Sequence, residues 1–212
     1  MPIELVTTDG VFALDGGEWE VTNNIWLVGD DREVVVFDAA HDHRPIVDAV
    51  AGRRVRAIVL THAHNDHINA AVPLRETVDA PILLHADDRM LWDVVWPGEA
   101  PDSTLEPGAT ITVAGHDLAV LHTPGHSPGC CCFHDSATGV LFSGDTLFCG
   151  GPGATGRSHS DEPTIIRSIV GTLLGLPDDT VVHTGHGDST TIGAERAAVL
   201  DRAAELGLRP TS

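Results

Sequence analysis

Short apolar runs separated by turns rich in Gly and Pro follow one another along the whole chain. Runs of roughly four to eight apolar or alternating residues predict β-strands. Residues 21–28 and 33–37 flank the turn Gly29-Asp30-Asp31 and therefore predict a hairpin. Further strands are expected at residues 3–8, 55–60, 82–84, 110–113, 117–122, 130–133, 140–143 and 181–184.

Segments with helical spacing of apolar residues lie between and after these strands. Helices are expected at residues 45–51, 70–78, 87–95, 163–174 and 192–206, and Pro stands near the start of two of them. Each half of the chain carries several strands followed by helices, which favours two packed sheets with outer helices over a continuous βαβ winding. The 212 residues suffice for one domain, residues 1–212, whose two αβ halves join in the region 96–108.

The chain carries a net charge of −19, and all 12 of its basic residues are Arg. A surface this acidic repels phosphate backbones and anionic membranes, so neither nucleic acid nor a membrane is expected as a partner. No apolar run approaches the roughly 18 residues of a membrane-spanning helix, and residues 1–4 lack the pattern of a secretory signal. The expected location is therefore cytoplasmic, while the sequence leaves the oligomeric state open.

Four Cys residues occur: the adjacent Cys130, Cys131 and Cys132, and Cys149. Successive side chains of a strand point to opposite faces, so three neighbouring thiols cannot all pair easily. In a chain expected in the cytoplasm, buried reduced thiols are the better interpretation, and Cys149 is expected to be packed. A metal site built from these Cys residues would lack the usual CxxC spacing.

Four side chains with metal-binding atoms fall within THAHNDH (residues 61–67), directly after the expected strand 55–60. His62 and His64 are two apart, so both can face one point on an extended segment. Asp66 and His67 follow at the expected start of a helix and point to a neighbouring position. Imidazole and carboxylate groups without thiolates suit zinc, iron or manganese.

Three further candidate ligands follow later strands: His126 in TPGHSPG (residues 123–129), Asp145 in SGDTLF (143–148) and His186 in HTGHGD (183–188). Each alone would be an ordinary loop residue. Together they are informative because each occupies a turn after an apolar strand, where neighbouring Gly residues let the backbone approach a ligand closely. The sequence predicts that these turns gather with residues 61–67 around one or two metal ions.

These motifs, in this order, resemble those of the metallo-β-lactamase-fold hydrolases, and within them the glyoxalase II-like thioester hydrolases. The resemblance rests on THAHNDH, TPGHSPG, SGDTLF and GHGDSTTIG (residues 185–193), and it runs from about residue 24 to residue 195. THAHNDH is highly specific, whereas the other motifs gain force in combination. The resemblance implies an α/β (α+β) fold, a four-layer αββα sandwich with the site at one edge of its two sheets.

The resemblance also assigns, position by position, the ligands of two divalent metal ions. The first ion takes His62, His64 and His126, the second takes Asp66, His67 and His186, and Asp145 bridges both. A water or hydroxide also bridges the ions, and Asp66 has a catalytic role because it orients this hydroxide and accepts its proton. Zinc is the favoured metal, with iron or manganese as alternatives. Asp145 also distinguishes the chain from true β-lactamases, whose second site typically uses a Cys.

The activity implied by the resemblance is hydrolysis of a small thioester by attack of the metal-bridging hydroxide. Metal coordination lowers the pKa of water from about 15.7 to about 7, and two metals can also polarise a carbonyl. A thiolate with a pKa of about 8.5 departs without a strong general acid, which suits a site with metals and few other catalytic groups. Arg157, the one cation in residues 150–160, is a candidate partner for a substrate carboxylate. A flexible surface Arg is the alternative.

Two questions stay open in the sequence: the thiol carrier and the reaction class. Glyoxalase II uses Lys and Tyr near its site and an added C-terminal domain to hold glutathione, but this chain has no Lys and no Tyr. Mycothiol is therefore a second candidate carrier, by analogy alone. Persulfide dioxygenase, an iron enzyme with the same fold and seven ligands, is the alternative function. Its members usually show GHDY at the last ligand, whereas this chain has GHGD, which favours the hydrolase.

Several residues near these motifs are expected to support or border the site. Asp38 ends the strand 33–37 and is a candidate hydrogen-bond partner for a ligand His, an arrangement common around metals. His41 and His43 are expected at the border of the site or on the surface. His183 lies three residues before His186 and is expected to have a structural role.

Overall fold

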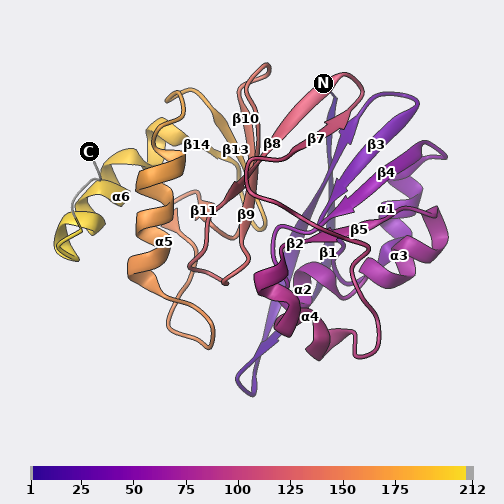
Figure 1. The fold of residues 1–212 in the computed structure, drawn as a ribbon, viewed down its shortest axis with the longest axis horizontal. Helices are drawn as coiled ribbons and strands as arrows, with labels where there is room; N and C mark the ends of the chain where they lie inside the picture. The colour runs from indigo at the N-terminus through magenta and orange to yellow at the C-terminus, as the bar shows by residue number, and fades with distance from the viewer. Residues whose placement is uncertain (1, 209–212) are drawn as a thin grey trace.

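The computed structural model describes residues 2–208 and shows two β-sheets packed face to face, with helices on both outer sides (Figure 1). The first sheet has the strand order β1-β2-β3-β4-β5-β6, and the second has the order β14-β13-β10-β9-β8-β7. Helices α1 and α3 cover one outer face, and α5 and α6 cover the other (Figure 1). The four-layer αββα sandwich expected from the sequence is therefore confirmed.

The first sheet combines antiparallel and parallel strands. Its strands are β1 (Ile3–Leu14), β2 (Gly17–Gly29), β3 (Glu33–Phe37), β4 (Arg54–Val59), β5 (Ile82–Leu84) and β6 (Ser103–Thr104). β1, β2 and β3 pair in antiparallel fashion, whereas β3, β4, β5 and β6 run parallel. Because parallel strands end at the same edge of a sheet, the loops after β3, β4 and β5 begin close together.

The second sheet sends three loops to one edge in the same way. Its strands are β7 (Thr110–Val113), β8 (His116–His122), β9 (Cys131–Asp135), β10 (Val140–Gly144), β13 (Val181–Thr184) and β14 (Thr190–Thr191). β10 is parallel to β13, and β9 is antiparallel to both β8 and β10. The loops after β8, β10 and β13 therefore leave from the same edge. β11 (Leu147–Phe148) and β12 (Gly151–Pro152) form a separate two-stranded ribbon beside them.

β1 and β2 form a long hairpin that was not predicted, because the sequence indicated separate strands at residues 3–8 and 21–28 and paired the second only with residues 33–37. Its residues pair continuously from Ile3 with Val28 to Leu14 with Gly17, around a turn in which Asp15 has φ 55° and Gly16 has φ 77°. Two successive residues with positive φ are typical of the tight turns that join twisted strands. Gly and acidic residues between positions 9 and 20 hide the apolar alternation, so strands were predicted only for the inner half of the hairpin. In Figure 1 the outer half projects below the other elements.

Apolar side chains fill the three spaces between the four layers. In the middle space Phe37 of the first sheet stacks on Phe142 of the second, with 4.6 Å between ring centroids. One outer space holds α1 (His43–Val50), α3 (Ala71–Val78) and α4 (Arg89–Val95) around Trp92, and the other holds α5 (Glu162–Ser168) and α6 (Ile192–Glu205). Each fully buried large apolar side chain contributes about 1.5–3 kcal/mol, so the sandwich gives the loops at its edge a rigid base.

The expected helices are present, with differences at their ends. Residues 87–95 divide into the 3₁₀ turn Ala86–Asp88 and α4, and residues 163–174 divide into α5 and a π-helical turn, Ile169–Leu173. The π-helical turn contains Gly171, whose lack of a side chain lowers the cost of departing from α geometry. Within residues 2–208, no helix has the length and apolar character that crossing a membrane requires.

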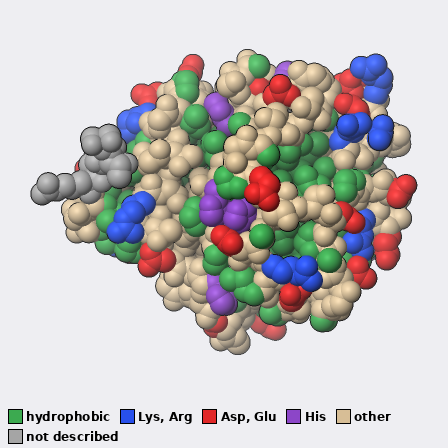
Figure 2. Space-filling model, viewed as in Figure 1, with side chains coloured by type: hydrophobic (Ala, Val, Ile, Leu, Met, Phe, Trp, Pro, Cys, Tyr) green, Lys and Arg blue, Asp and Glu red, His purple; other side chains and the backbone are tan. Residues whose placement is uncertain are grey.

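The surface face in Figure 2 shows how the charges are distributed. Acidic side chains surround this face, Arg side chains are spread out over it, and His side chains gather near its middle. A protein that binds a nucleic-acid backbone needs a continuous basic stripe or patch. This face carries no such patch.

Candidate metal centre

The THAHNDH stretch turns sharply from the end of β4 into the short helix α2 (Asn65–Ile68). Asp38, which follows β3, holds this turn: its carboxylate accepts hydrogen bonds from Thr61 N at 2.8 Å and from Thr61 Oγ1 at 3.0 Å. Asp38 itself has φ 59°, a left-handed conformation that Asp adopts more readily than most residues. The His67 N–H donates to the His64 carbonyl at 3.0 Å and closes the first turn of α2.

The structure brings all seven predicted ligand side chains together at this edge of the two sheets. They form three overlapping groups whose ligand atoms lie within 4.8 Å of one another: His62–His64–His126, His62–His67–Asp145 and Asp66–His67–His186. We call the first the three-His group and the last the mixed group. In the three-His group, His64 Nδ1 lies 3.0 Å from His62 Nε2 and 3.0 Å from His126 Nε2.

Asp145 lies between the two groups. Its Oδ1 atom is 3.3 Å from His67 Nε2, and its Oδ2 atom is 3.5 Å from both His126 Nε2 and His186 Nε2. In the mixed group, His186 Nε2 lies 3.1 Å from His67 Nε2 and 3.3 Å from Asp66 Oδ2. One carboxylate therefore reaches ligand atoms of both groups.

The atoms at this centre fit a cation better than they fit one another. Neighbouring ring nitrogens of the three-His group are 3.0 Å apart, yet a neutral imidazole has only one N–H for its two nitrogens. The buried Oδ1 atoms of Asp66 and Asp145 have no hydrogen-bond partner in the described part of the chain. Buried polar atoms are normally paired. A divalent cation and the water bound to it would supply these partners, and imidazoles with carboxylates are the donors that zinc, iron and manganese accept.

The outward-facing ring nitrogens of two candidate ligands are bound to backbone carbonyls. His126 Nδ1 lies 2.7 Å from the Ala154 carbonyl, and His186 Nδ1 lies 2.8 Å from the Thr22 carbonyl. A carbonyl only accepts hydrogen bonds, so Nδ1 carries the proton in both rings. The Nε2 atoms of both rings therefore point into the centre, the orientation that metal binding requires.

Asp38 carries a further chain of hydrogen bonds into the centre. Its Oδ2 atom lies 2.8 Å from His67 Nδ1 and accepts a hydrogen bond from the Thr61 hydroxyl. The oxygen of this hydroxyl lies 3.1 Å from His62 Nδ1. Because the Thr61 hydrogen points to Asp38, its oxygen accepts from His62 Nδ1–H. Asp38 thus forms the hydrogen bond with a candidate ligand His that the sequence predicted.

Burial and charge give the two groups different protonation states. Burial lowers the pKa of His64 to about 3. For His186, burial opposes the charged form, but the Asp145 carboxylate raises the pKa to about 10. For Asp66, burial opposes ionisation, but the neighbouring His67 charge lowers the pKa to about 2. Burial also lowers the pKa of His62, so His62 and His64 are neutral imidazoles at neutral pH, whereas the mixed group is a network of opposite charges.

An open cavity of about 350 Å³ lies over the candidate ligands and gives them access to solvent. Five candidate ligands line it: His64, Asp66, His126, Asp145 and His186. The rest of its wall consists of Phe12, Val21, Thr22, Phe148, Ala154 and Arg157. The wall is mainly apolar, as small-molecule sites usually are, with few polar groups to orient a ligand.

Arg157 is held at this cavity by the outer half of the β1–β2 hairpin. Its guanidinium carbon lies 4.0 Å from the ring centroid of Trp19 and 5.2 Å from that of Phe12. Asp15, at the tip of the hairpin, accepts a hydrogen bond from Ser158 N at 2.9 Å and ties the two segments together. The structure thus places Arg157 at the cavity, as predicted, and adds two aromatic residues that the sequence-based prediction missed.

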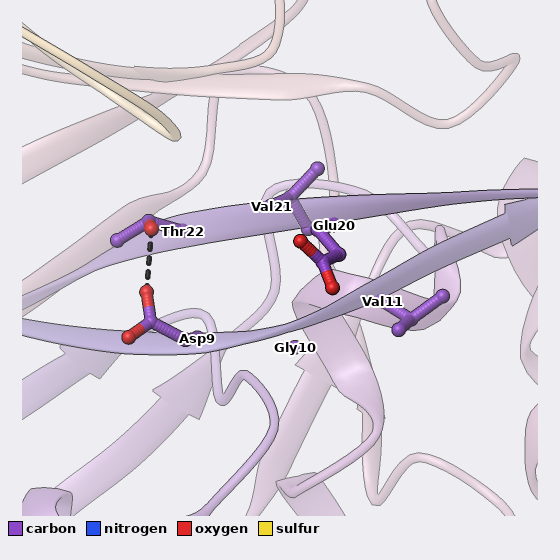
Figure 3. A pocket seen from close by; sticks show the side chains of 6 residues that line it. All are labelled: Asp9, Gly10, Val11, Glu20, Val21 and Thr22. Carbon is purple, nitrogen blue, oxygen red and sulfur yellow. Dashed lines mark hydrogen bonds between the residues drawn. The ribbon is translucent and has the colours of Figure 1, made fainter.

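A second hollow, of about 530 Å³, lies on the same hairpin (Figure 3). It is lined by Asp9, Gly10, Val11, Glu20, Val21 and Thr22. Asp9 and Thr22 face each other across the two strands and are hydrogen-bonded (Figure 3). The hollow shares Val21 and Thr22 with the cavity over the candidate ligands, so the two adjoin. Although it is larger, none of the seven candidate ligands lines it, and the chemistry belongs to the smaller cavity.

Asn23 is a further residue of the site that the prediction missed. It is fully buried on β2, its Nδ2 atom lies 3.1 Å from Asp66 Oδ2, and its Oδ1 atom lies 2.8 Å from His41 Nε2. His41 therefore borders the centre through Asn23. Asn23 and Asn24 interrupt an otherwise apolar strand, and such a polar pair in a buried strand is the signal that could have identified it.

The remaining His and Cys residues lie outside the seven-residue cluster. His183 packs its ring on Trp26, with 4.3 Å between centroids, in the structural role that was expected. Cys130, Cys131 and Cys132 are buried free thiols, as predicted. The prediction for Cys149 was wrong, because its thiol is exposed. It directly precedes the turn at Gly150, which leaves the sheet and carries Cys149 out of the core.

The family model of the metallo-β-lactamase superfamily matches residues 19–186, a span that contains all seven candidate ligands. The chain belongs to this superfamily. The BLEG-1 B3 metallo-β-lactamase superposes with a TM-score of 0.76 at 30% identity, over 90% of this chain and 97% of that one. The structure of TTHA1623 in a di-iron-bound form superposes with a TM-score of 0.75 at 35% identity, over 83% of this chain and 93% of that one.

One relative adds a reaction class to this comparison. Hydroxyacylglutathione hydrolase GloC of Haemophilus influenzae is 31% identical over 188 residues, which cover 81% of this chain and 87% of that protein. Together the family, the relative and the His and Asp cluster define a hydrolase of the metallo-β-lactamase fold that depends on a divalent metal.

Proposed function

We propose that this protein is a metal-dependent hydrolase that cleaves a small thioester, carried on glutathione or on mycothiol. The observation that carries the proposal is the convergence of seven imidazole and carboxylate side chains beneath an open cavity. The similarity to the Haemophilus influenzae hydroxyacylglutathione hydrolase supports the substrate class.

Two divalent metal ions would be held by these side chains. His62, His64 and His126 would hold one ion, Asp66, His67 and His186 would hold the other, and Asp145 would be shared. When bound, such ions lower the pKa of coordinated water to about 7 and polarise a substrate carbonyl. Zinc suits this donor set, and the di-iron form of TTHA1623 makes iron the second candidate.

Asp66 is the catalytic group that the chain itself contributes. Its Oδ2 atom is fixed by Asn23 Nδ2 at 3.1 Å and faces His186 Nε2 at 3.3 Å, while its buried Oδ1 atom has no hydrogen-bond partner within residues 2–208. Burial raises its pKa and the His67 charge lowers it, and the result, about 2, keeps the carboxylate ionised at neutral pH. Oδ1 is therefore available to accept a hydrogen bond from the attacking water, to orient it and to take its proton.

The cavity suits a leaving group that departs without a general acid. Apart from the candidate ligands, the one ionisable side chain that lines it is Arg157, which does not release a proton at neutral pH. A thiolate, with a pKa of about 8.5, departs as an anion. An amine or an alkoxide has a far higher pKa and needs a proton as it leaves. This difference favours a thioester over an amide or an oxygen ester.

Arg157 is the proposed contact for an anionic group of the substrate. The rings of Trp19 and Phe12 flank its guanidinium and restrict its position. A restricted guanidinium binds a carboxylate through paired, charge-assisted hydrogen bonds. Glutathione and other thiol carriers with carboxylates or acidic acyl groups would meet this requirement.

The proposal is tested with thioesters that share one acyl group and differ in the thiol: glutathione, mycothiol and coenzyme A. The zinc-loaded and iron-loaded proteins are assayed for release of the thiol, with the oxygen ester of the same acyl group as a control. We expect a much higher kcat/KM for one of the thioesters than for the oxygen ester. A protein that carries two metal ions per chain and cleaves none of the thioesters would contradict the proposal.

Two further assays separate this function from its rivals within the same fold. Oxygen uptake by the iron-loaded protein with a persulfide, without thioester cleavage, would indicate the persulfide dioxygenase instead. Hydrolysis of a chromogenic β-lactam in preference to thioesters would indicate an activity like that named for BLEG-1. The proposed hydrolase is expected to be inactive or much slower in both assays.

A further inference from the structure

We propose that Asp88 is a positioning residue that sets the metal affinity of the three-His group. Asp88 ends the 3₁₀ turn that follows β5, and its side chain is 0% exposed. It is not one of the seven candidate ligands, and the mechanism described above does not use it. The inference rests on the proposed metal centre, but it concerns how the chain shapes that centre.

The Asp88 carboxylate binds two ligand-bearing loops at once. Its Oδ2 atom accepts from Ala63 N at 2.9 Å and from Ser127 Oγ at 2.6 Å, and its Oδ1 atom accepts from Gly129 N at 2.6 Å. Ala63 is the residue between the first two ligands of the three-His group, and Ser127 directly follows the third. One side chain thus fixes the backbone beside every member of that group.

The second loop packs directly against the carboxylate. A Cβ atom at Gly129 would lie 2.7 Å from Asp88 Cγ, closer than real contacts allow, so this approach depends on glycine. Ser127 is held on its other side as well, because its Oγ atom lies 3.1 Å from the Cys130 thiol. The loop that carries the third imidazole therefore has little freedom to move relative to Asp88.

The mixed group has different supports. Asp38 contacts His67 at 2.8 Å, and Asn23 contacts Asp66 at 3.1 Å, whereas the hydrogen bonds of Asp88 go to the two loops of the three-His group. Hydrogen-bonded partners behind metal ligands typically change metal affinity or activity by about 10–100-fold when they are replaced. Loss of the Asp88 bonds should therefore weaken one of the two metal positions and spare the other.

Asp88→Asn tests this role because it keeps the size of the side chain. An amide has one accepting oxygen and one donating NH₂ group. At least one of the three N–H or O–H groups that donate to the carboxylate would therefore face the NH₂ group and lose its acceptor. Asp135, at the end of β9 that is farther from Gly129, offers a matched control. It is also buried and also accepts three hydrogen bonds, from Ala137 N, Thr138 Oγ1 and His116 Nδ1. Asp135→Asn therefore removes a comparable anchor far from the candidate ligands.

The experiment measures zinc binding by wild type, Asp88→Asn and Asp135→Asn in competition with a chromogenic chelator. We expect two tight zinc ions per chain in wild type and in Asp135→Asn. In Asp88→Asn we expect one tight ion and one whose affinity is lower by about 10–100-fold. Unchanged affinities in Asp88→Asn, or equal weakening in Asp88→Asn and Asp135→Asn, would overturn the inference.

Ser127→Ala provides a second variant in case Asp88→Asn does not fold. It removes one of the three bonds, so it should weaken the same metal position to a smaller extent and leave the other unchanged. If a folded Ser127→Ala protein binds both zinc ions with wild-type affinity, the role of Asp88 is overturned. If wild type binds no zinc, the proposed metal centre itself fails. If wild type binds two ions and the variants bind them equally tightly, the metal centre stands and only the role of Asp88 fails.

Discussion

The three-His group and the mixed group lie side by side, yet they are built from opposite chemistry. The three-His group consists of buried imidazoles, and burial lowers the pKa of its central member, His64, to about 3. The mixed group combines two imidazoles with the Asp66 carboxylate, and the neighbouring Asp145 carboxylate raises the pKa of His186 to about 10 against the effect of burial. His62 and His64 of the first group are therefore neutral at neutral pH, and the second group is an ion network.

This difference shows how one loop can serve two metal positions. THAHNDH contributes to both groups, but its His62 and His64 face the neutral group while Asp66 faces the charged one. A metal ion that binds His62 and His64 displaces no proton from these two rings at neutral pH, whereas one that enters the mixed group must displace a proton from the His186 imidazolium. The two positions should therefore differ in how they respond to pH and to the loss of their supports.

The largest expected effect follows from His64→Ala, because this ring is central to the three-His group. We expect a loss of activity of more than about 100-fold, beyond the range for residues that only support a ligand. The protein should remain folded by circular dichroism. His183→Ala is the control, since its ring packs on Trp26 outside the cluster. Full activity in His64→Ala would contradict the assignment of the three-His group.

Asp38→Asn should weaken chiefly the metal position opposite the one that Asp88 supports, because Asp38 contacts His67 directly and reaches His62 only through Thr61. Asn tolerates the left-handed backbone of residue 38, where φ is 59°, so the substitution changes the hydrogen bonds with little backbone strain. An amide has one accepting oxygen, so it cannot replace both Oδ1, which accepts from Thr61 N, and Oδ2, which accepts from Thr61 Oγ1 and His67 Nδ1. We expect about 10–100-fold weaker binding of one zinc ion, measured by chelator competition. Equal weakening of both ions would show that Asp38 does not distinguish the groups.

The stability of the metal-free protein should depend on pH through both groups, with opposite signs. The folded pKa of His64, about 3, is below the unfolded value of about 6.5, so the unfolded state binds more protons between these values and stability falls on acidification. The folded pKa of His186, about 10, is above the unfolded value, so its stabilisation is complete below about pH 6.5 and is lost as the pH rises toward 10.

Urea denaturation at a series of pH values checks this prediction. Each titrating imidazole changes the free energy of unfolding by at most about 1.4 kcal/mol per pH unit. His64→Gln should flatten the acid limb of the stability profile, and His186→Gln should flatten the alkaline limb. A profile in which both variants change the same limb would contradict the separation of the two groups.

The smallest expected effects concern the substrate side of the cavity. Arg157→Ala should raise KM by about tenfold through loss of a charge-assisted hydrogen bond, with little change in kcat. Trp19→Ala releases the guanidinium without removing it, and a cation–π contact of about 0.5–1 kcal/mol corresponds to a two- to fivefold rise in KM. Steady-state kinetics with the preferred thioester measures both. A large fall in kcat with unchanged KM would place Arg157 in the chemical step instead.

The sequence was sufficient to predict the αββα fold and the cluster of seven candidate ligands. Both depend on local signals: short apolar strands set the layers, and each candidate ligand lies in a turn directly after a strand. Strands that end at the same edge bring their turns together, so the convergence of residues as distant as His62 and His186 follows from the order of strands.

Apart from Asp38, the supports of the centre could not be predicted in the same way. Asp88 and Asn23 have no distinctive motif, and their role depends on which loops the folded chain brings against them. The outer half of the β1–β2 hairpin was missed because its strands are stabilised by pairing with each other, not by an apolar face. Its contact between Trp19 and Arg157 joins segments far apart in the sequence and depends on tertiary structure alone.

An anomalous difference map from crystals grown with zinc would show whether these seven side chains hold two divalent metal ions. Two peaks are predicted, one in contact with His62, His64 and His126, and one in contact with Asp66, His67 and His186, with Asp145 touching both. A map without density at this edge of the sandwich, or with zinc only at other His residues, would contradict the account.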